Sequence, residues 1–115
     1  MTQANGRLPL DMAVLEAIFG DDVELRLGIL DEFCTVTATY LNEFQAAKDP
    51  VAIGAVAHKL KSSARTIGAH PLADICAGLE SAGRNGQQTI IDQLLPRLEP
   101  EIRRVADFVA ALERL

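Results

Sequence analysis

Four polar side chains of the sequence share one face of a predicted helix, because residues three or four apart are neighbours on a helix surface. They are His58, Lys61, Ser62 and Arg65. A neutral imidazole is a nucleophile near pH 7, since its unperturbed pKa is about 6.5. The ammonium of Lys61, one turn away, could reach an anion attached to His58. The pattern suits a phosphoryl acceptor, because phosphoryl transfer needs mainly positioning and charge stabilisation of the moving group.

The histidine of this face is predicted to be exposed. The apolar stripe of the same helix runs through Val56, Leu60 and Ile67, and at about 100° per residue His58 points away from it. Residues 51–73 contain no Asp or Glu, although the whole chain has a net charge of −5. The sequence therefore predicts a cationic patch centred on His58 in an acidic protein.

The neighbours of the histidine on this helix are small or basic. Gly54 and Ala55 lie four and three positions before it, and Ser62 lies four positions after it. We expect these small residues to let a second macromolecule approach the imidazole closely. Lys59 and Arg65 could contact the same partner, or they could be solubilising charges. The spacing alone does not decide between an ordinary solvated surface and a reactive site.

The elements that must position these side chains are all predicted to be helices. Apolar residues recur every three or four positions from Leu10 onward, and no segment alternates long enough to form a strand. Short loops between amphipathic helices force neighbours to run antiparallel. We therefore expect an all-α fold, an antiparallel up-down four-helix bundle with a short N-terminal helix over 10–19 capping one end. The chain, residues 1–115, is predicted to be a single domain in which residues 1–9 are frayed.

Capping residues and glycine mark the ends of the first long helices. Asp21 and Asp22 are N-cap candidates for a helix of roughly 26 residues, about 39 Å long. The pair Asp49-Pro50 begins the helix that carries the histidine. Gly68 is placed to end that helix.

The last helix is bounded less clearly. A predicted turn over 83–86 precedes it, and Thr89 with Asp92 resembles a capping box at its start. Pro96 and Pro100 fall inside its apolar stripe, and an interior proline removes a backbone hydrogen bond and bends a helix. We predict a helix that bends at these prolines; the alternative is a helix that begins beside the second proline.

Composition limits the classes of function. Aromatic residues make up 4% and Trp is absent, so stacking platforms for nucleic-acid bases are not expected. The net charge of −5 disfavours duplex nucleic acid and anionic membranes as main partners. No apolar run approaches the roughly 20 residues of a membrane span, and no secretion signal is visible. Cys34 and Cys76 lie on apolar stripes, so we expect small buried thiols in a reduced, cytoplasmic protein.

The segment 57–80 resembles the signature of histidine-containing phosphotransfer (HPt) domains. The family pattern is roughly A-H-x-L-K-G-S-A-x-x-x-G-A-x-x-L-x-x-x-C-x-x-L-E, and this chain follows it at the same spacing. The flanking helices also fit, so the resemblance extends over about residues 8–115. It implies a phosphorelay intermediate, not an enzyme, that exchanges a phosphoryl group with the aspartate of a response-regulator receiver domain. That receiver could belong to a hybrid sensor kinase.

The resemblance also implies individual roles. His58 matches the phosphorylated histidine, Lys61 the lysine that steadies the phosphoryl group, and Gly68 the glycine that ends the histidine helix. Glu80 matches a position that in some relatives hydrogen-bonds the imidazole from the neighbouring helix and fixes its tautomer. Ser62 departs from the usual glycine, so clearance for the docking partner is reduced. This chain is expected to bind no metal or cofactor, and Mg²⁺ would come with the receiver.

Other interpretations remain. The main alternative is a helical docking adaptor that binds a receiver without phosphotransfer, although the chain keeps both His58 and Lys61. A metal-binding bundle would need inward Glu-x-x-His pairs, which neither histidine has, and no nucleophile–base–orienter set of a hydrolase is visible. The chain also lacks a nucleotide-binding loop and the phosphoacceptor box of sensor-kinase dimerisation helices, which favours a monomer. His70 is interpreted as a loop or capping residue and Arg84 as a surface residue.

Overall fold

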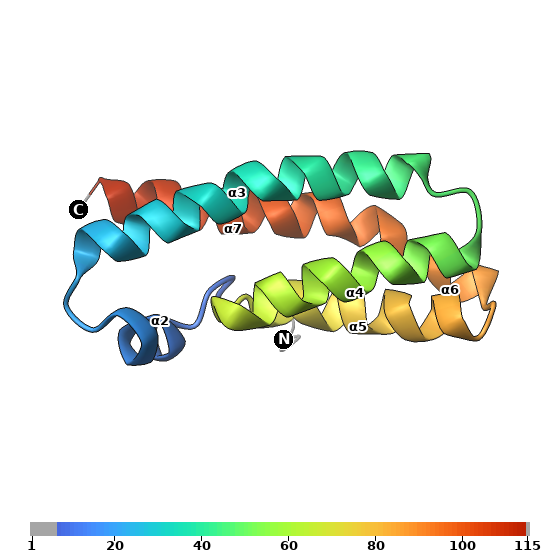
Figure 1. Cartoon of the computed structure of the whole chain (residues 1–115), viewed down its shortest axis with the longest axis horizontal. Coiled ribbons are helices and arrows are strands. Elements are labelled where there is room, and N and C mark those ends of the chain that lie inside the picture. Colours follow the sequence, from blue (N-terminus) through green and yellow to red (C-terminus); the bar gives the residue numbers. More distant parts are fainter. Residues whose placement is uncertain (1–6, 115) are drawn as a thin grey trace.

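The computed structural model describes residues 7–114, and all regular elements of this range are helical (Figure 1). In chain order they are α2 (Met12–Phe19), α3 (Val23–Ala46), α4 (Pro50–Thr66), α5 (His70–Arg84), α6 (Gln88–Leu94), the 3₁₀ turn η1 (Leu95–Arg97) and α7 (Leu98–Glu113). No strand occurs between residues 7 and 114, so the all-α prediction is confirmed.

The predicted fraying of residues 1–9 lies partly outside the described residues, which begin at Arg7. The structure describes only residues 7–9 of that segment. The guanidinium of Arg7 donates to the carboxylate of Asp74 at 2.8 Å, and Pro9 is buried. The start of the described chain is thus tied to α5.

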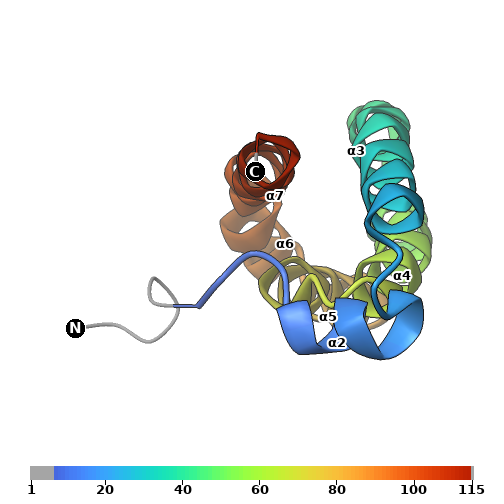
Figure 2. The same ribbon diagram turned by 90° about the vertical axis from the view of Figure 1, so that its left-hand side faces the viewer.

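The long helices lie side by side, and successive ones run in opposite directions (Figure 1). Helix α4 has its most extensive contacts with α5, while α3 packs on both α4 and α7. Seen end-on, α3 and α7 stand above the α4–α5 pair, and α2 lies against the near end (Figure 2). None of the described helices is long and apolar enough to cross a membrane.

The first two long helices begin at the predicted caps. The carboxylate of Asp22 accepts from the backbone N–H of Leu25 at 3.0 Å at the start of α3. At the start of α4 the carboxylate of Asp49 accepts from the N–H of Ala52 at 2.8 Å, and Pro50 is the first helical residue. These short-range signals fix where α4 begins and therefore which residues it exposes.

Gly68 follows the end of α4 and also contacts the start of α2. Its φ of 77° lies in the left-handed region, where a side chain is strained. Its backbone also meets the start of α2: its carbonyl accepts from the N–H of Asp11 at 2.9 Å, and an added Cβ would stand 3.0 Å from the Cβ of Val14. The residue therefore docks α2 as well as ending the histidine helix.

The second half departs from the predicted boundaries. Helix α5 continues through Arg84, so Gly83 is helical and buried, and the predicted turn over 83–86 is confined to its last two residues, Asn85 and Gly86. The predicted capping box does not form, since Asp92 accepts from the side chain of Gln88 and α6 has no side-chain cap. The last helix is interrupted rather than bent: η1, which contains Pro96, separates α6 from α7.

Every long helix contributes side chains to the core. Its largest fully buried side chains are Leu10, Leu15, Leu30, Leu60, Leu72, Leu79, Ile91, Leu98 and Val105. Val23, although apolar, is 50% exposed at the first position of α3. The apolar faces of α4 and α5 bury each other, which leaves the polar face of α4 to solvent.

Candidate functional site

Helix α4 presents His58 to solvent. The histidine side chain is 62% exposed, whereas Ala57 and Leu60, on either side of it in the sequence, are fully buried. The predicted orientation of this histidine is therefore correct. Ala55, Ser62 and Arg65 are exposed with it, as their spacing requires.

The imidazole is held from the neighbouring helix. Nδ1 of His58 lies 2.8 Å from Oε2 of Glu80 on α5. An ionised carboxylate can only accept a hydrogen bond, so this contact places the ring hydrogen on Nδ1. Nε2 then keeps its lone pair, and the described residues offer it no hydrogen-bond partner. The contact joins residues 22 positions apart, and the sequence suggests it only through the family resemblance.

Glu80 is the centre of the cluster. Its Oε1 accepts from the ammonium of Lys61, and its Oε2 accepts from the guanidinium of Arg84 at 3.2 Å as well as from His58. The Glu80 side chain is 12% exposed and that of Lys61 17%. One largely buried carboxylate thus has two permanent cations and the imidazole around it.

The ionisation of Glu80 follows from these contacts. The hydrogen bond from Lys61 is the largest influence that holds the pKa of the Glu80 carboxyl below its ordinary value of 4.5, and the contact with His58 acts in the same direction. Burial opposes them by favouring the neutral acid. Near neutral pH the group is therefore a carboxylate, which accepts a hydrogen bond from Nδ1–H and cannot donate one.

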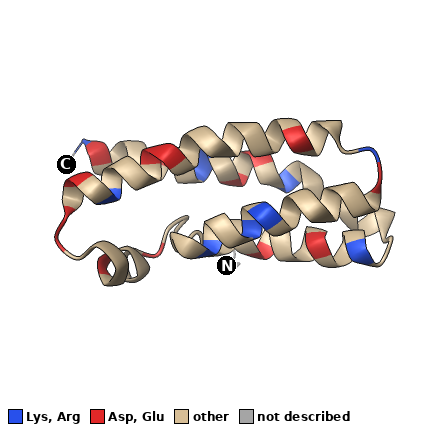
Figure 3. Ribbon diagram, in the orientation of Figure 1, with Lys and Arg blue, Asp and Glu red and all other residues tan. Residues whose placement is uncertain are grey.

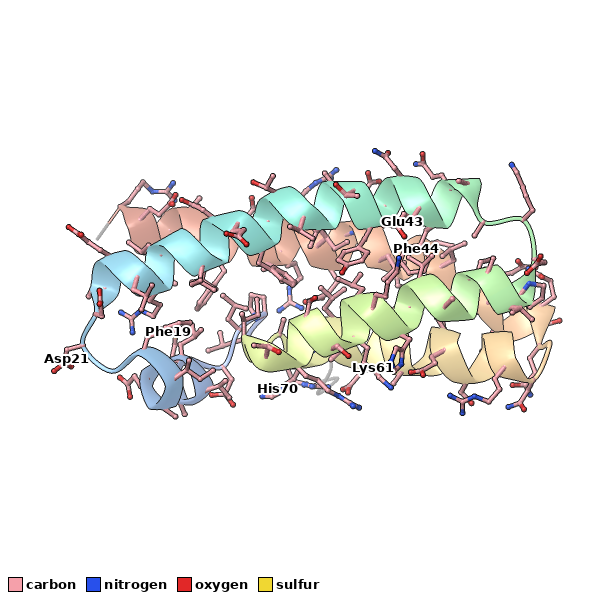
Figure 4. The ribbon with its side chains drawn as sticks, viewed as in Figure 1. Phe19, Asp21, Glu43, Phe44, Lys61 and His70 are labelled. Carbon is pink, nitrogen blue, oxygen red and sulfur yellow. The ribbon has the colours of Figure 1, made fainter. Side chains whose placement is uncertain are left out.

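Lys61 points from α4 toward α5 in the described structure (Figure 4). The sequence places it one turn from His58, where it could reach an anion on the ring. In the structure its partner is Glu80, so the lysine and the histidine share one carboxylate instead of contacting each other. Arg84, which the sequence analysis treats as surface, belongs to the same cluster. Its i, i+4 spacing from Glu80 was the signal that could have identified it.

The predicted cationic patch is smaller than the sequence implies. Helix α4 carries no acidic residue, as Figure 3 shows, but neighbouring helices supply counterions. The ammonium of Lys59 lies 2.6 Å from the carboxylate of Glu43 on α3 and 6.0 Å from the ring centroid of Tyr40. Lys59 is therefore engaged within the fold. Arg65 is exposed and has no ion pair with any described residue.

The predicted position of Gly54 on the partner-facing surface is wrong. Gly54 is buried, and an added Cβ would stand 3.4 Å from the carbonyl oxygen of Glu80 and from Cα of Gly83. The helical turn between Gly54 and His58 directs the glycine toward α5 while the histidine remains at the rim of that interface. Ala55 stays on the exposed face.

His70 is the second histidine and lies apart from this cluster. It is the first residue of α5, not a loop residue, and makes no capping hydrogen bond. Figure 4 labels His70, and its Nε2 lies 3.0 Å from Oδ2 of Asp11, which ties the starts of α5 and α2 together. The His70 contact lowers the pKa of the Asp11 carboxyl. This contact gives His70 a structural role, because it links the starts of two helices.

The two thiols offer no competing nucleophile. Cys76 is buried, and burial raises the pKa of its thiol to about 12. Cys34 is half-buried rather than fully buried as predicted, and burial followed by the charge of Asp31 raises its thiol pKa. Both are therefore protonated near neutral pH.

The site is an open surface and not a cleft. A pocket of about 460 Å³ lies elsewhere, between α5, η1 and the start of α7, and none of the residues around His58 lines it. Across residues 7–114 no group of three or more His, Cys, Asp or Glu side chains could hold a metal ion. An exposed nucleophile without an enclosed substrate pocket suits a macromolecular reactant that brings the rest of the chemistry.

Known proteins resemble the chain in sequence and in structure. A family model described as Hpt domain matches residues 8–114. The crystal structure of histidine-containing phosphotransfer protein B from Pseudomonas aeruginosa PAO1 superposes with a TM-score of 0.84 and 26% sequence identity. The match covers 93% of this chain and 96% of that one. No curated protein sequence matches significantly.

Proposed function

Because the chain belongs to the Hpt domain family, we propose that it is a phosphorelay intermediate that carries a phosphoryl group on Nε2 of His58. Members of this family carry phosphoryl groups in phosphorelays and are not kinases. The observation that carries the atomic assignment is the 2.8 Å contact between Nδ1 of His58 and Glu80, which leaves the exposed Nε2 as the nucleophile.

The transfer follows from this arrangement. The Nε2 lone pair attacks the phosphorus of an aspartyl phosphate, a P–N bond forms, and the P–O bond to the aspartate breaks. The bonding electrons of that P–O bond leave with the aspartate carboxylate. Positive charge develops on the imidazole, whose Nδ1–H remains hydrogen-bonded to Glu80, and the carboxylate stabilises that charge. The reverse reaction uses the same groups.

Lys61 and Ser62 are proposed to act on the phosphoryl oxygens. Lys61 is one turn from His58, and its flexible stem lets the ammonium move from Glu80 toward a phosphoryl group. Ser62 lies four residues after His58 on the exposed face, where its hydroxyl could donate to the same group. The dianionic product would thus replace Glu80 as one of the partners of Lys61.

The partner is proposed to be a receiver domain of a response regulator or of a hybrid sensor kinase. The receiver would supply Mg²⁺ in its acidic pocket, and the exposed Arg65 and Arg84 suit a negatively charged rim. Ala55 and Ser62 would lie under the docked domain, with Lys59 at the edge. We also propose that the chain acts in the cytoplasm as a monomer. Its working form would be the antiparallel four-helix bundle of α3, α4, α5 and α7, with α2 capping one end.

A transfer assay tests this function. The purified chain is mixed with Mg²⁺ and phosphorylated receivers from the same organism, beside a His58→Gln variant. Acid-labile, alkali-stable phosphate on the wild type but not on His58→Gln is the expected result. Label on both proteins would move the site elsewhere, with His70 tested next by His70→Gln. Binding of a receiver without label on the wild type would support the docking adaptor and overturn phosphotransfer.

A further inference from the structure

We propose that Gly54 on α4 and Gly83 on α5 are positioning residues that set the distance at which Glu80 meets His58. The inference rests on the proposed function and assigns a role in it to two residues that do not touch the imidazole. Both glycines lie in the interface between α4 and α5, across which Glu80 contacts His58.

The backbones of the two helices pack closely against each other at these glycines. An added Cβ on Gly83 would stand 2.5 Å from the carbonyl oxygen of Pro50, 2.8 Å from Cα of Gly54 and 2.9 Å from its nitrogen. All three are backbone atoms, which cannot move aside as the end of a side chain can. A Cβ on Gly54 would meet the carbonyl oxygen of Glu80 at 3.4 Å. The backbone that carries Glu80 therefore rests directly against Gly54.

The close approach lies one turn from the reacting pair. Gly54 precedes His58 by four residues on α4, and Gly83 follows Glu80 by three residues on α5. Because α4 and α5 run in opposite directions (Figure 1), both steps lead the same way along the interface, by about 6 Å on α4 and about 4.5 Å on α5. The separation of the helices at the glycines therefore fixes the span that the Glu80 side chain must bridge.

A wider separation would weaken every contact of the cluster that crosses the interface. Both His58 and Lys61 reach Glu80 from α4. Helices usually pack 8–10 Å apart according to the side chains between them. A methyl group at Gly83 would force the backbones apart where they now touch, and hydrogen bonds of 2.8 Å tolerate little lengthening. The contact between Arg84 and Glu80 lies within α5 and would remain.

Gly83→Ala is the direct test. We expect the imidazole of His58, which ¹⁵N NMR should show as the Nδ1–H tautomer in the wild type, to become a mixture of tautomers. The pKa of the Glu80 carboxyl, followed by ¹³C NMR, should rise toward its ordinary value as the Lys61 and His58 contacts weaken. The rate of phosphoryl transfer to a receiver should fall about 10- to 100-fold, as when an orienting group is displaced.

Two glycine variants provide matched controls. Gly78→Ala changes the same helix, but its Cβ would meet only the flexible end of Leu94, at 2.7 Å. Gly28→Ala lies on α3, where nothing stands within 4 Å. Both should keep the wild-type tautomer, Glu80 pKa and transfer rate. If Gly83→Ala does not fold, Gly54→Val takes its place: a Cβ on Gly54 would only be in ordinary contact at 3.4 Å, whereas the further carbons of valine would press on the backbone of α5.

The outcomes separate this inference from the proposed function. Loss of stability in Gly83→Ala with unchanged tautomer, Glu80 pKa and transfer rate would overturn the positioning role. The positioning role is equally overturned if Gly54→Val is the folded variant and leaves all three unchanged. A wild-type protein that accepts no phosphoryl group would refute the proposed function, while the tautomer and the carboxyl pKa would still report on positioning.

Discussion

At the scale of the residue, Glu80 decides what His58 can do. It accepts from Nδ1 and is kept ionised chiefly by Lys61. Replacing it by alanine removes both the orientation of the ring and the counterion for developing charge. We expect Glu80→Ala to lower the rate of transfer about 10- to 100-fold, measured by quenched-flow assay with a phosphorylated receiver.

Glu80→Gln should give a rate between those of the wild type and Glu80→Ala, because an amide oxygen can still accept from Nδ1 but carries no charge. Glu43→Ala is the matched control, since it removes a carboxylate that holds Lys59 on the other side of α4. A transfer rate in Glu80→Ala equal to that of Glu43→Ala would contradict the role assigned to this carboxylate.

The same carboxylate gives the folded protein a defined pH dependence. The pKa of Glu80 is lower in the folded state than its ordinary value of 4.5. Its contacts therefore stabilise the fold fully above that ordinary value, and the contribution is lost as the pH falls through the lower, folded-state pKa. Urea unfolding of wild type and Glu80→Gln should differ most near neutral pH and converge in acid. A difference that is independent of pH would show that Glu80 does not contribute through its charge.

At the scale of the element, Gly68 joins the end of α4 to α2. A side chain there meets both an unfavourable φ and the backbone and side chain of the α2 start. We expect Gly68→Ala to lower the free energy of unfolding by about 1–3 kcal/mol, measured by urea unfolding. Gly86→Ala isolates the backbone component, because Gly86 has a φ of 65° and nothing within 4 Å. Equal losses in the two variants would show that the contact with α2 adds nothing.

Sequence signals that act within a few residues predicted the elements well. Asp22 and Asp49 cap the helices where expected, because a cap depends on its own turn alone. The segment 83–86 was predicted as a turn, but only Asn85 and Gly86 form one, because burial of Gly83 against Gly54 keeps α5 helical to Arg84. Thr89 and Asp92 resemble a cap, yet the helix begins after Gln87 and Asp92 bonds to Gln88.

The functional site also depends on contacts between helices, which signals within one helix do not predict. The exposure of His58 follows from the period of its own helix, so the sequence predicted it. Its pairing with Glu80 depends on how α4 and α5 cross, which no periodicity reports; only the family resemblance pointed to it. The counterion of Lys59 likewise comes from α3, so the predicted charge of the patch was too high. A single sequence does not show which residues of different helices come into contact.

At the scale of the whole molecule, one chain supplies all the helices around the core. Helices α3, α4, α5 and α7 bury their apolar faces on one another. We therefore expect a monomer of about 12.4 kDa, measured by sedimentation equilibrium at micromolar concentration. The His58 face is then available to a receiver without dissociation of a partner copy. A stable species of twice this mass would contradict the prediction.

We propose that His58 carries a phosphoryl group on Nε2 while Glu80 holds Nδ1. It is tested most directly by treating the chain with phosphoramidate, from which the phosphoryl group passes to the ring nitrogen as ammonia leaves. ³¹P and ¹⁵N NMR of the product then identify the modified atom. We expect a single phosphohistidine at Nε2 of His58, absent in His58→Gln. Phosphate on Nδ1, on His70, or on no histidine at all would contradict it.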